Sequence, residues 1–342
     1  MKNNNLKKMT INFIFFILLI IITLRVMLKD QNTDKIFEII AQSKGQFIAI
    51  GILAMVIYVV LEGVNIRRTL NLLGEKTTFF SNIKYALIGF FFSGITPAAS
   101  GGQPMQIYYM HKDGIAVGHS TLALLINLTS MQINTISIAL ISVVFNYKYL
   151  NDMLSVLLVI GILLNSSALA LLLISIFSKR LSRWFMKAAI RIMKLLRIKN
   201  MDKKIKKIGR ELRNYQKSAK YIKKNKKLMV KIILTTLVQL LVYYSVAYWT
   251  YRALGFKGHN IMEIITMQSV LFATVSGIPS PGSVGVSEGA FLEIFRNVYP
   301  EQMIRSATLL NRGINFYIFM LISGIVVLVN QVKTKKNKEI LW

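Results

Sequence analysis

The sequence predicts an all-α polytopic membrane protein, with about six transmembrane helices plus two re-entrant broken hairpins in an inverted repeat. Three observations lead to this prediction. Of the 342 residues, 54% are hydrophobic. Several apolar runs reach the roughly 18 residues that a helix needs to cross a bilayer core. Two stretches rich in Pro and Gly interrupt apolar sequence, one in each half of the chain.

The predicted crossings are apolar runs long enough to span about 30 Å at about 1.5 Å per residue. The first run begins after a basic N-terminus, as a signal peptide does, but it is long and no small-residue cleavage site follows it. We therefore interpret it as a retained span. The six runs cover residues 11–28, 46–63, 117–145, 152–178, 228–251 and 304–330.

The two interrupted segments cover residues 80–111, with "SGITPAASGGQP", and 261–298, with "SGIPSPGSVGVSEG". Both motifs begin Ser-Gly-Ile, at Ser93 and at Ser276. Non-helical backbone at membrane depth persists only where it is buried in protein or lines a cavity. Interrupted segments in corresponding halves of a chain indicate a transporter-like site near the midplane. The alternative is two ordinary proline kinks in long helices.

Charge placement favours hairpins over single crossings. The net charge is +29, and about half of the 43 Lys and Arg fall between Lys179 and Lys231. Only the hairpin arrangement places this block in the cytoplasm, as the positive-inside rule requires. The expected organisation is a first membrane half at 1–178, a basic cytoplasmic amphipathic segment at 179–227 and a second membrane half at 228–342. Both termini are expected to be cytoplasmic.

Composition also excludes several function classes. The chain has no cysteine, so neither a thiolate nucleophile nor a Cys-ligated metal is available. Its three histidines are scattered without ligand spacing, so we expect no metal site and no cofactor. Nucleic acid is not the expected partner of the basic segment, because no folded recognition module fits within it.

Helix ends left by a chain break expose unpaired N–H groups and a positive dipole end, which can hold a phosphate. Glycines let a headgroup approach the backbone closely, and hydroxyl and amide side chains supply neutral hydrogen-bonding groups. The alternative is that these hydroxyls only satisfy backbone groups freed by proline. No catalytic residue is predicted. The candidate lipid-binding residues are Thr96, Ser100, Gly101, Gly102, Gln103, Ser280, Gly282, Ser283, Gly285, Ser287, Glu288 and Arg312.

Glu288 is the sharpest of these candidates, because an ionisable residue at membrane depth is costly and marks a functional site by default. It either receives a cationic group of the substrate or forms a structural ion pair with Arg312. Glu62, near the end of its predicted span, is expected to reach the membrane interface. Asn127 is expected to form interhelical hydrogen bonds. Tyr243 is assigned to an aromatic belt.

The motifs "GITPAASGGQP", "SGIPSPGSVGVSEGAF" and "LLNRG" carry a family resemblance. Over nearly its whole length the chain resembles the lysylphosphatidylglycerol synthase transmembrane family, the membrane part of the MprF-type multiple peptide resistance proteins. The resemblance implies a flippase fold with inverted repeats in a bacterial cell membrane. Such a protein moves aminoacylated or related phospholipids between leaflets and contributes to resistance to cationic antimicrobial peptides.

Larger members of that family carry a soluble acyltransferase-like domain that transfers lysine from lysyl-tRNA to phosphatidylglycerol. This sequence ends at Trp342, and no segment in it is long enough for such a synthase domain. The first expectation is therefore a non-enzymatic translocator of lysylphosphatidylglycerol or a related lipid. The alternatives are a phosphatidylglycerol lysyltransferase and a membrane partner of a separate synthase. The expected partner is membrane phospholipid; a homodimer stays open.

Overall fold

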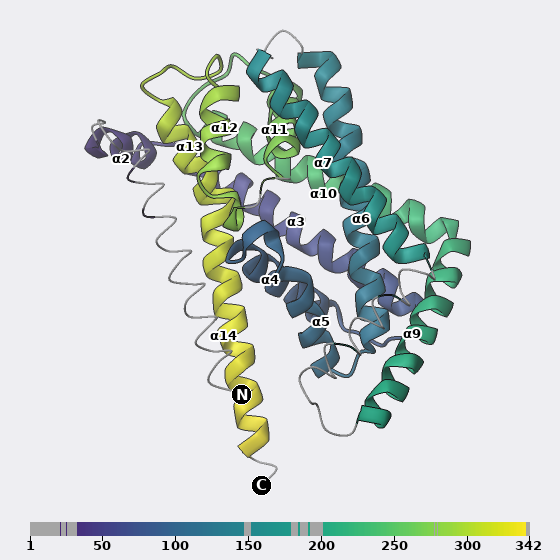
Figure 1. Ribbon diagram of the computed structural model, residues 1–342. Helices are drawn as coiled ribbons and strands as arrows, with labels where there is room; N and C mark the ends of the chain where they lie inside the picture. Colours follow the sequence, from purple (N-terminus) through teal and green to yellow (C-terminus); the bar gives the residue numbers. More distant parts are fainter. Residues whose placement is uncertain are drawn as a thin grey trace.

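The computed structural model describes residues 33–146, 152–178, 201–276 and 280–339, with residue 278 and four isolated positions. Within these residues the regular structure is helical throughout, as the composition predicts (Figure 1). Five helices of the described part are long and apolar enough to cross a membrane. The predicted span at 11–28 lies almost wholly outside the described residues.

The long helices correspond to five of the six predicted spans. The last one is built from three consecutive pieces, because a π-helical turn interrupts it. π-helical turns within α-helices are frequent at functional sites. The five are α3 (Gly45–Leu72), α6 (Val117–Asn146), α7 (Asp152–Phe177), α10 (Lys226–Ala253) and the series α13 (Ile304–Arg312), η4 (Gly313–Tyr317) and α14 (Ile318–Glu339).

Helices α3 and α10 pack closely against each other at the centre of the molecule. Met55 and Val59 of α3 share one apolar cluster with Val246 of α10. A polar contact accompanies this packing, because Asn65 Nδ2 donates to Thr236 Oγ1 at 3.0 Å. Interhelical hydrogen bonds of this kind hold helices together where lipid offers no polar partner.

The segment 80–111 folds as a hairpin, as predicted. Its elements are α4 (Phe79–Gly94), the short 3₁₀ turn η1 (Pro97–Ala99) and α5 (Gly102–Lys112). The two helices run back along each other: Gln106 Nε2 donates to the carbonyl of Tyr85 at 3.0 Å. Farther from the break, the Tyr85 hydroxyl donates to Asp113 Oδ2 at 2.6 Å. The segment is therefore not a single crossing.

The segment 261–298 forms the second hairpin, from α11 (Ile261–Val275), η3 (Pro281–Ser283) and α12 (Val286–Ile294). Helix α11 begins with a capping box, in which Asn260 Oδ1 accepts from Glu263 N at 3.0 Å and the Glu263 carboxylate accepts from Asn260 N at 3.0 Å. The two hairpins approach from opposite ends of the bundle (Figure 1). Their tips, η1 and η3, are in contact.

The tips share part of their backbone conformation, which supports the predicted inverted repeat. Thr96 and Ser280 are both extended, as a residue before proline prefers to be. Two residues after each of these prolines a non-glycine residue is left-handed, Ala99 (φ 53°) in the first tip and Ser283 (φ 54°) in the second, where Gly282 (φ 58°) is left-handed as well. The backbone conformation thus pairs Thr96 with Ser280. This pairing differs by one residue from the alignment of the two Ser-Gly-Ile sequences, which would pair Thr96 with Pro279.

Two further helices lie outside this arrangement. Helix α2 (Thr33–Ala41) precedes α3, and α9 (Met201–Lys224) belongs to the predicted basic segment. One face of α9 packs on the bundle: Ala219 and Ile222 are buried, and the Tyr215 hydroxyl donates to the Ser175 carbonyl at 2.9 Å. That residues 179–227 are cytoplasmic stays a prediction, as do the boundaries of the two membrane halves.

Candidate functional site

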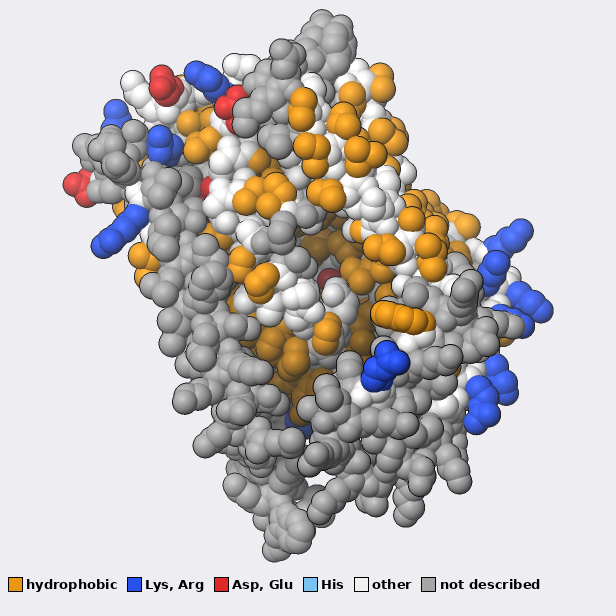
Figure 2. All heavy atoms as spheres, viewed as in Figure 1, with side chains coloured by type: hydrophobic (Ala, Val, Ile, Leu, Met, Phe, Trp, Pro, Cys, Tyr) orange, Lys and Arg blue, Asp and Glu red, His pale blue; other side chains and the backbone are white. Residues whose placement is uncertain are grey.

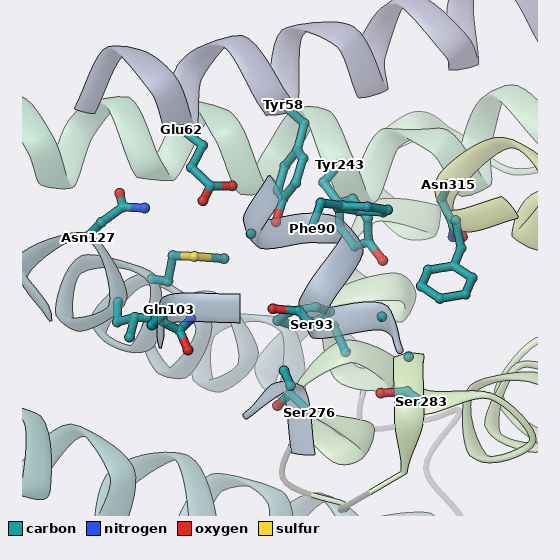
Figure 3. A pocket seen from close by; sticks show the side chains of 18 of the residues that line it. Tyr58, Glu62, Phe90, Ser93, Gln103, Asn127, Tyr243, Ser276, Ser283 and Asn315 are labelled. Carbon is teal, nitrogen blue, oxygen red and sulfur yellow. The ribbon is translucent and has the colours of Figure 1, made fainter. Parts of the chain in front are cut away.

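A cavity of about 280 Å³ lies where the two hairpin tips meet. Its walls come from α3, α4, α5, α6, α10 and α11, from both tips and from the π-helical turn η4. Figure 2 shows the face of the molecule with a hollow whose walls are largely hydrophobic and whose floor holds acidic atoms. Figure 3 shows Glu62 and Tyr58 pointing into this space from α3, with Gln103 and Ser276 on the opposite side.

The cavity brings together predicted residues from both interrupted segments. Gln103, in the first turn of α5, lines it on the side of the first hairpin. Ser280, Gly282 and Ser283 line it on the side of the second hairpin. These residues are far apart in sequence, and only the contact between the two tips places them around one space.

Other predicted residues of the first break serve the hairpin itself. The Thr96 hydroxyl donates to the Phe92 carbonyl at 2.6 Å and accepts from Gly101 N at 2.9 Å. A Cβ added at Gly102 would lie 3.0 Å from the Gly89 carbonyl, so glycine here allows close packing of α5 on α4. Ser100 is exposed at the tip. That these residues contact lipid stays a prediction.

Glu288 and Arg312 are in contact, as expected if Glu288 forms a structural ion pair. Arg312 Nε donates to Glu288 Oε1 at 2.9 Å, and Tyr317 donates its hydroxyl to the same oxygen at 3.2 Å. Glu288 Oε2 accepts from Gly285 N at 2.8 Å. Both carboxylate oxygens are thus occupied by protein donors. Ser287, next to Glu288 in the chain, is also buried. The cavity lining does not include the predicted residues Gly285, Ser287, Glu288 and Arg312.

The expected position of Glu62 at the membrane interface is wrong. The predicted span ended at residue 63, but α3 continues to Leu72, which places Glu62 well inside the helix. Its carboxylate lines the cavity, with Gln106 Nε2 at 3.5 Å from Oε1. The signal was available in sequence, because Tyr58 and Glu62 are four residues apart and share one helix face.

Tyr243 also lies elsewhere than the aromatic belt to which the sequence assigned it. It lines the cavity from the middle of α10, and its ring centroid is 5.1 Å from that of Tyr58 on α3. Several tyrosines lie close together in the sequence of α10. Their spacing alone does not predict which of them face the interior of the bundle and which lie near a membrane surface.

Two asparagines that line the cavity have side-chain oxygens without a partner. Asn127 of α6 and Asn315 of η4 both line it and are 4% and 3% exposed. In the described part of the chain, neither Asn127 Oδ1 nor Asn315 Oδ1 has a hydrogen-bond partner, and the same is true of Ser280 Oγ. Asn165 of α7, by contrast, is fully engaged, donating to the Ala273 carbonyl at 3.1 Å.

The cavity therefore carries one carboxylate, unpaired carbonyl and hydroxyl oxygens, and aromatic rings. Lysine, arginine and histidine are absent from the described residues that line it. The described residues also hold no cluster of three or more His, Asp or Glu that could bind a metal ion. Such a lining offers hydrogen-bond acceptors and the negative faces of rings, which suit a ligand that donates hydrogen bonds.

Comparison with known proteins agrees with this architecture. The family described as "Lysylphosphatidylglycerol synthase TM region" matches residues 11–323. A protein described as "UPF0104 membrane protein", from Archaeoglobus fulgidus, is 22% identical over 333 residues, which are 94% of this chain and 98% of that protein. Because the family match covers nearly the whole chain and the helices have membrane-spanning length, the chain belongs to the lysylphosphatidylglycerol synthase TM region family of membrane proteins.

Proposed function

We propose that this protein moves phospholipid between the two leaflets of a membrane, in the manner of a flippase. The observation that carries the proposal is the meeting of two broken hairpins, from opposite ends of the bundle, at a cavity that holds a carboxylate and several neutral polar groups between apolar walls. Broken segments with exposed polar groups at the membrane midplane are a recurring design of transport sites.

The physical problem in lipid translocation is the headgroup, because polar and charged groups lose their hydration when they enter hydrocarbon. A cavity with its own hydrogen-bonding groups replaces part of that hydration. Its volume of about 280 Å³ is near the lower end of ligand pockets, which run from about 300 to about 1,000 Å³, so it suits a headgroup rather than a whole lipid. The acyl chains then stay in the surrounding lipid.

The cargo we propose is lysylphosphatidylglycerol, another aminoacylated lipid or a related phospholipid, moved in a bacterial cell membrane. Beside aliphatic residues, the cavity lining includes neutral polar side chains, aromatic rings and a carboxylate, which can bind and orient a headgroup. The alternatives remain a phosphatidylglycerol lysyltransferase and a membrane partner of a separate synthase.

The test uses purified protein in vesicles with fluorescent phosphatidylglycerol or its lysyl derivative, and a membrane-impermeant quencher. Met131 of α6 lines the cavity, so Met131→Trp fills part of it. Leu140, on the same helix, is 52% exposed on the outer surface, so Leu140→Trp is the matched control. We expect the wild-type chain and the control to expose inner-leaflet label to the quencher, and the filled cavity to slow this exposure severalfold.

The same sample, given lysyl-tRNA, is assayed for new aminoacyl lipid. Label movement without new lipid supports the translocator, and new lipid establishes the transferase instead. Equal rates for Met131→Trp and Leu140→Trp would mean that lipid moves by a route other than this cavity. Absence of label movement from the wild-type chain would overturn the proposed function.

A further inference from the structure

Glu62 differs from the carboxylates that form ion pairs in the described residues. Glu288 is paired with Arg312, Glu75 with His119 and Asp113 with Lys84. Within the part of the chain that the structure describes, Glu62 has no lysine, arginine or histidine in ion-pair contact, and its hydrogen bond comes from the neutral amide of Gln106 at 3.5 Å. A carboxylate inside a membrane bundle is costly unless a positive charge or several donors accompany it.

The cavity around Glu62 contains further hydrogen-bond acceptors and aromatic rings. Two buried asparagines, Asn127 and Asn315, also line the cavity, and their side-chain oxygens have no hydrogen-bond partner in the described part of the chain. Rings of Tyr58 and Tyr243 stand beside the carboxylate, and their hydroxyls face the same space (Figure 3). A carboxylate, carbonyl oxygens and ring faces are together the partners that an alkylammonium group uses, since it has three N–H donors and no acceptor.

We propose that this cavity binds the cationic ammonium group of the transported lipid, with Glu62 as its counter-ion. The inference deepens the proposed function and depends on it only in taking the ligand to be a lipid. It also moves the cation-receiving role from Glu288, whose oxygens are occupied by Arg312, Tyr317 and Gly285 N. A phosphate group would find a repelling carboxylate here and no cationic side chain among the described lining residues.

The test measures binding by titration calorimetry of the full chain in neutral detergent. The first ligand is short-chain lysylphosphatidylglycerol, and the second is the same lipid with its amines acetylated, which removes their charge. We expect the wild-type chain to bind the lipid with free amines at least about tenfold more tightly than the acetylated lipid. This factor corresponds to the loss of one hydrogen bond between charged groups. Glu62→Gln should bind both lipids equally, because it keeps the shape and the contact with Gln106.

Two further variants keep the result interpretable. Glu38 is exposed on α2, so Glu38→Gln makes the same chemical change away from the cavity and should keep the preference. Glu62→Asp retains the charge and should keep part of the preference, even if Glu62→Gln lowers the yield of folded protein. Lysine amide, which carries the ammonium groups without the lipid, distinguishes a lipid ligand from a soluble amine.

The outcomes separate this inference from the proposed function. Equal binding of both lipids by the wild-type chain, binding of neither, or an unchanged preference in Glu62→Gln would overturn the inference whether or not lipid moves in vesicles. A preference that depends on Glu62, without lipid movement in vesicles, would support the inference and overturn the flippase. Lysine amide binding as tightly as the lysyl lipid would overturn the identification of the ligand as a lipid.

Discussion

Arg312 reaches from the last span to the second hairpin and forms a buried ion pair with Glu288, with 5% and 1% of their side chains exposed. Arg312 also donates from its terminal guanidinium nitrogen to the Gly282 carbonyl at 2.9 Å. One side chain therefore fixes both the tip of the hairpin and the start of α12. Since Arg312 directly precedes the π-helical turn that carries Asn315, this pair positions part of the cavity wall.

Removing one partner of this pair should strongly destabilise the fold. Arg312→Met leaves the Glu288 carboxylate buried without its cation, and breaking a buried pair in this way costs about 3–5 kcal/mol. The double variant Arg312→Met with Glu288→Leu removes both charges and should recover much of that loss. Thermal unfolding in detergent, followed by circular dichroism, measures the difference. A double variant no more stable than Arg312→Met would show that packing, rather than the uncompensated charge, causes the loss.

Gly282 should tolerate no side chain, whereas Gly289, seven residues further along the chain, should tolerate one. Gly282 has φ 58°, and a Cβ there would lie 2.3 Å from Phe316 Cζ. Gly289 lies within α12, and a Cβ there meets nothing within 4 Å. We expect Gly282→Ala to lower the unfolding midpoint, while Gly289→Ala keeps or raises it, because alanine is favoured over glycine in a helix by about 0.5–1 kcal/mol. Similar midpoints for the two variants would contradict the constrained geometry of the tip.

The sequence predicted the helical class, five described spans and both hairpins, because apolar length and proline position are local signals. The charge of residues 179–227 added the decisive long-range argument, since only hairpins placed this segment on the expected side. The breaks were also located correctly: both contain a proline that begins a 3₁₀ turn, at Pro97 and Pro281.

The site was harder to predict, because it depends on which faces of distant helices meet. Gln103 and Ser280 were found through the motifs that contain them. Glu62 was missed because its helix is longer than the apolar run, and Asn315 because nothing local distinguishes it. Whether a polar residue such as Asn127 faces a cavity or a partner is decided by packing between helices, which the sequence pattern does not contain.

Asn165 should be a stabilising link between α7 and the second hairpin. Its side-chain amide donates to the Ala273 carbonyl at 3.1 Å and contacts Ser276 Oγ at 3.0 Å. We expect Asn165→Leu to lower the free energy of unfolding by about 0.6 to about 1.7 kcal/mol, the mean and the maximum measured for interhelical hydrogen bonds in a membrane protein.

The matched control is Ser167→Ala, on the same helix. The Ser167 hydroxyl donates within its own helix, to the Leu163 carbonyl at 2.8 Å, and makes no link to the hairpin. Unfolding in a mixed detergent titration, monitored by tryptophan fluorescence, compares the two variants. A loss in Ser167→Ala as large as that in Asn165→Leu would remove the special role of Asn165.

The final prediction concerns which ends of the hairpins share a side of the membrane. In Figure 1 the far end of α5 lies at the same end of the bundle as the end of α9, and the α10–α11 connection lies at the other end. Lys112, Lys224 and Lys257 are exposed at these three places. The chain contains no cysteine, so single cysteines introduced there have no background.

We expect a membrane-impermeant maleimide, applied to intact cells, to label Lys257→Cys and to spare Lys112→Cys and Lys224→Cys until the membrane is opened. This pattern follows if the hairpins enter from opposite sides and the basic residues near α9 stay in the cytoplasm. Labelling of Lys112→Cys and Lys224→Cys from opposite sides would mean that the first hairpin crosses the membrane completely. In that case the two tips could not meet at a midplane cavity, and the inverted arrangement on which the proposed headgroup site depends would be lost.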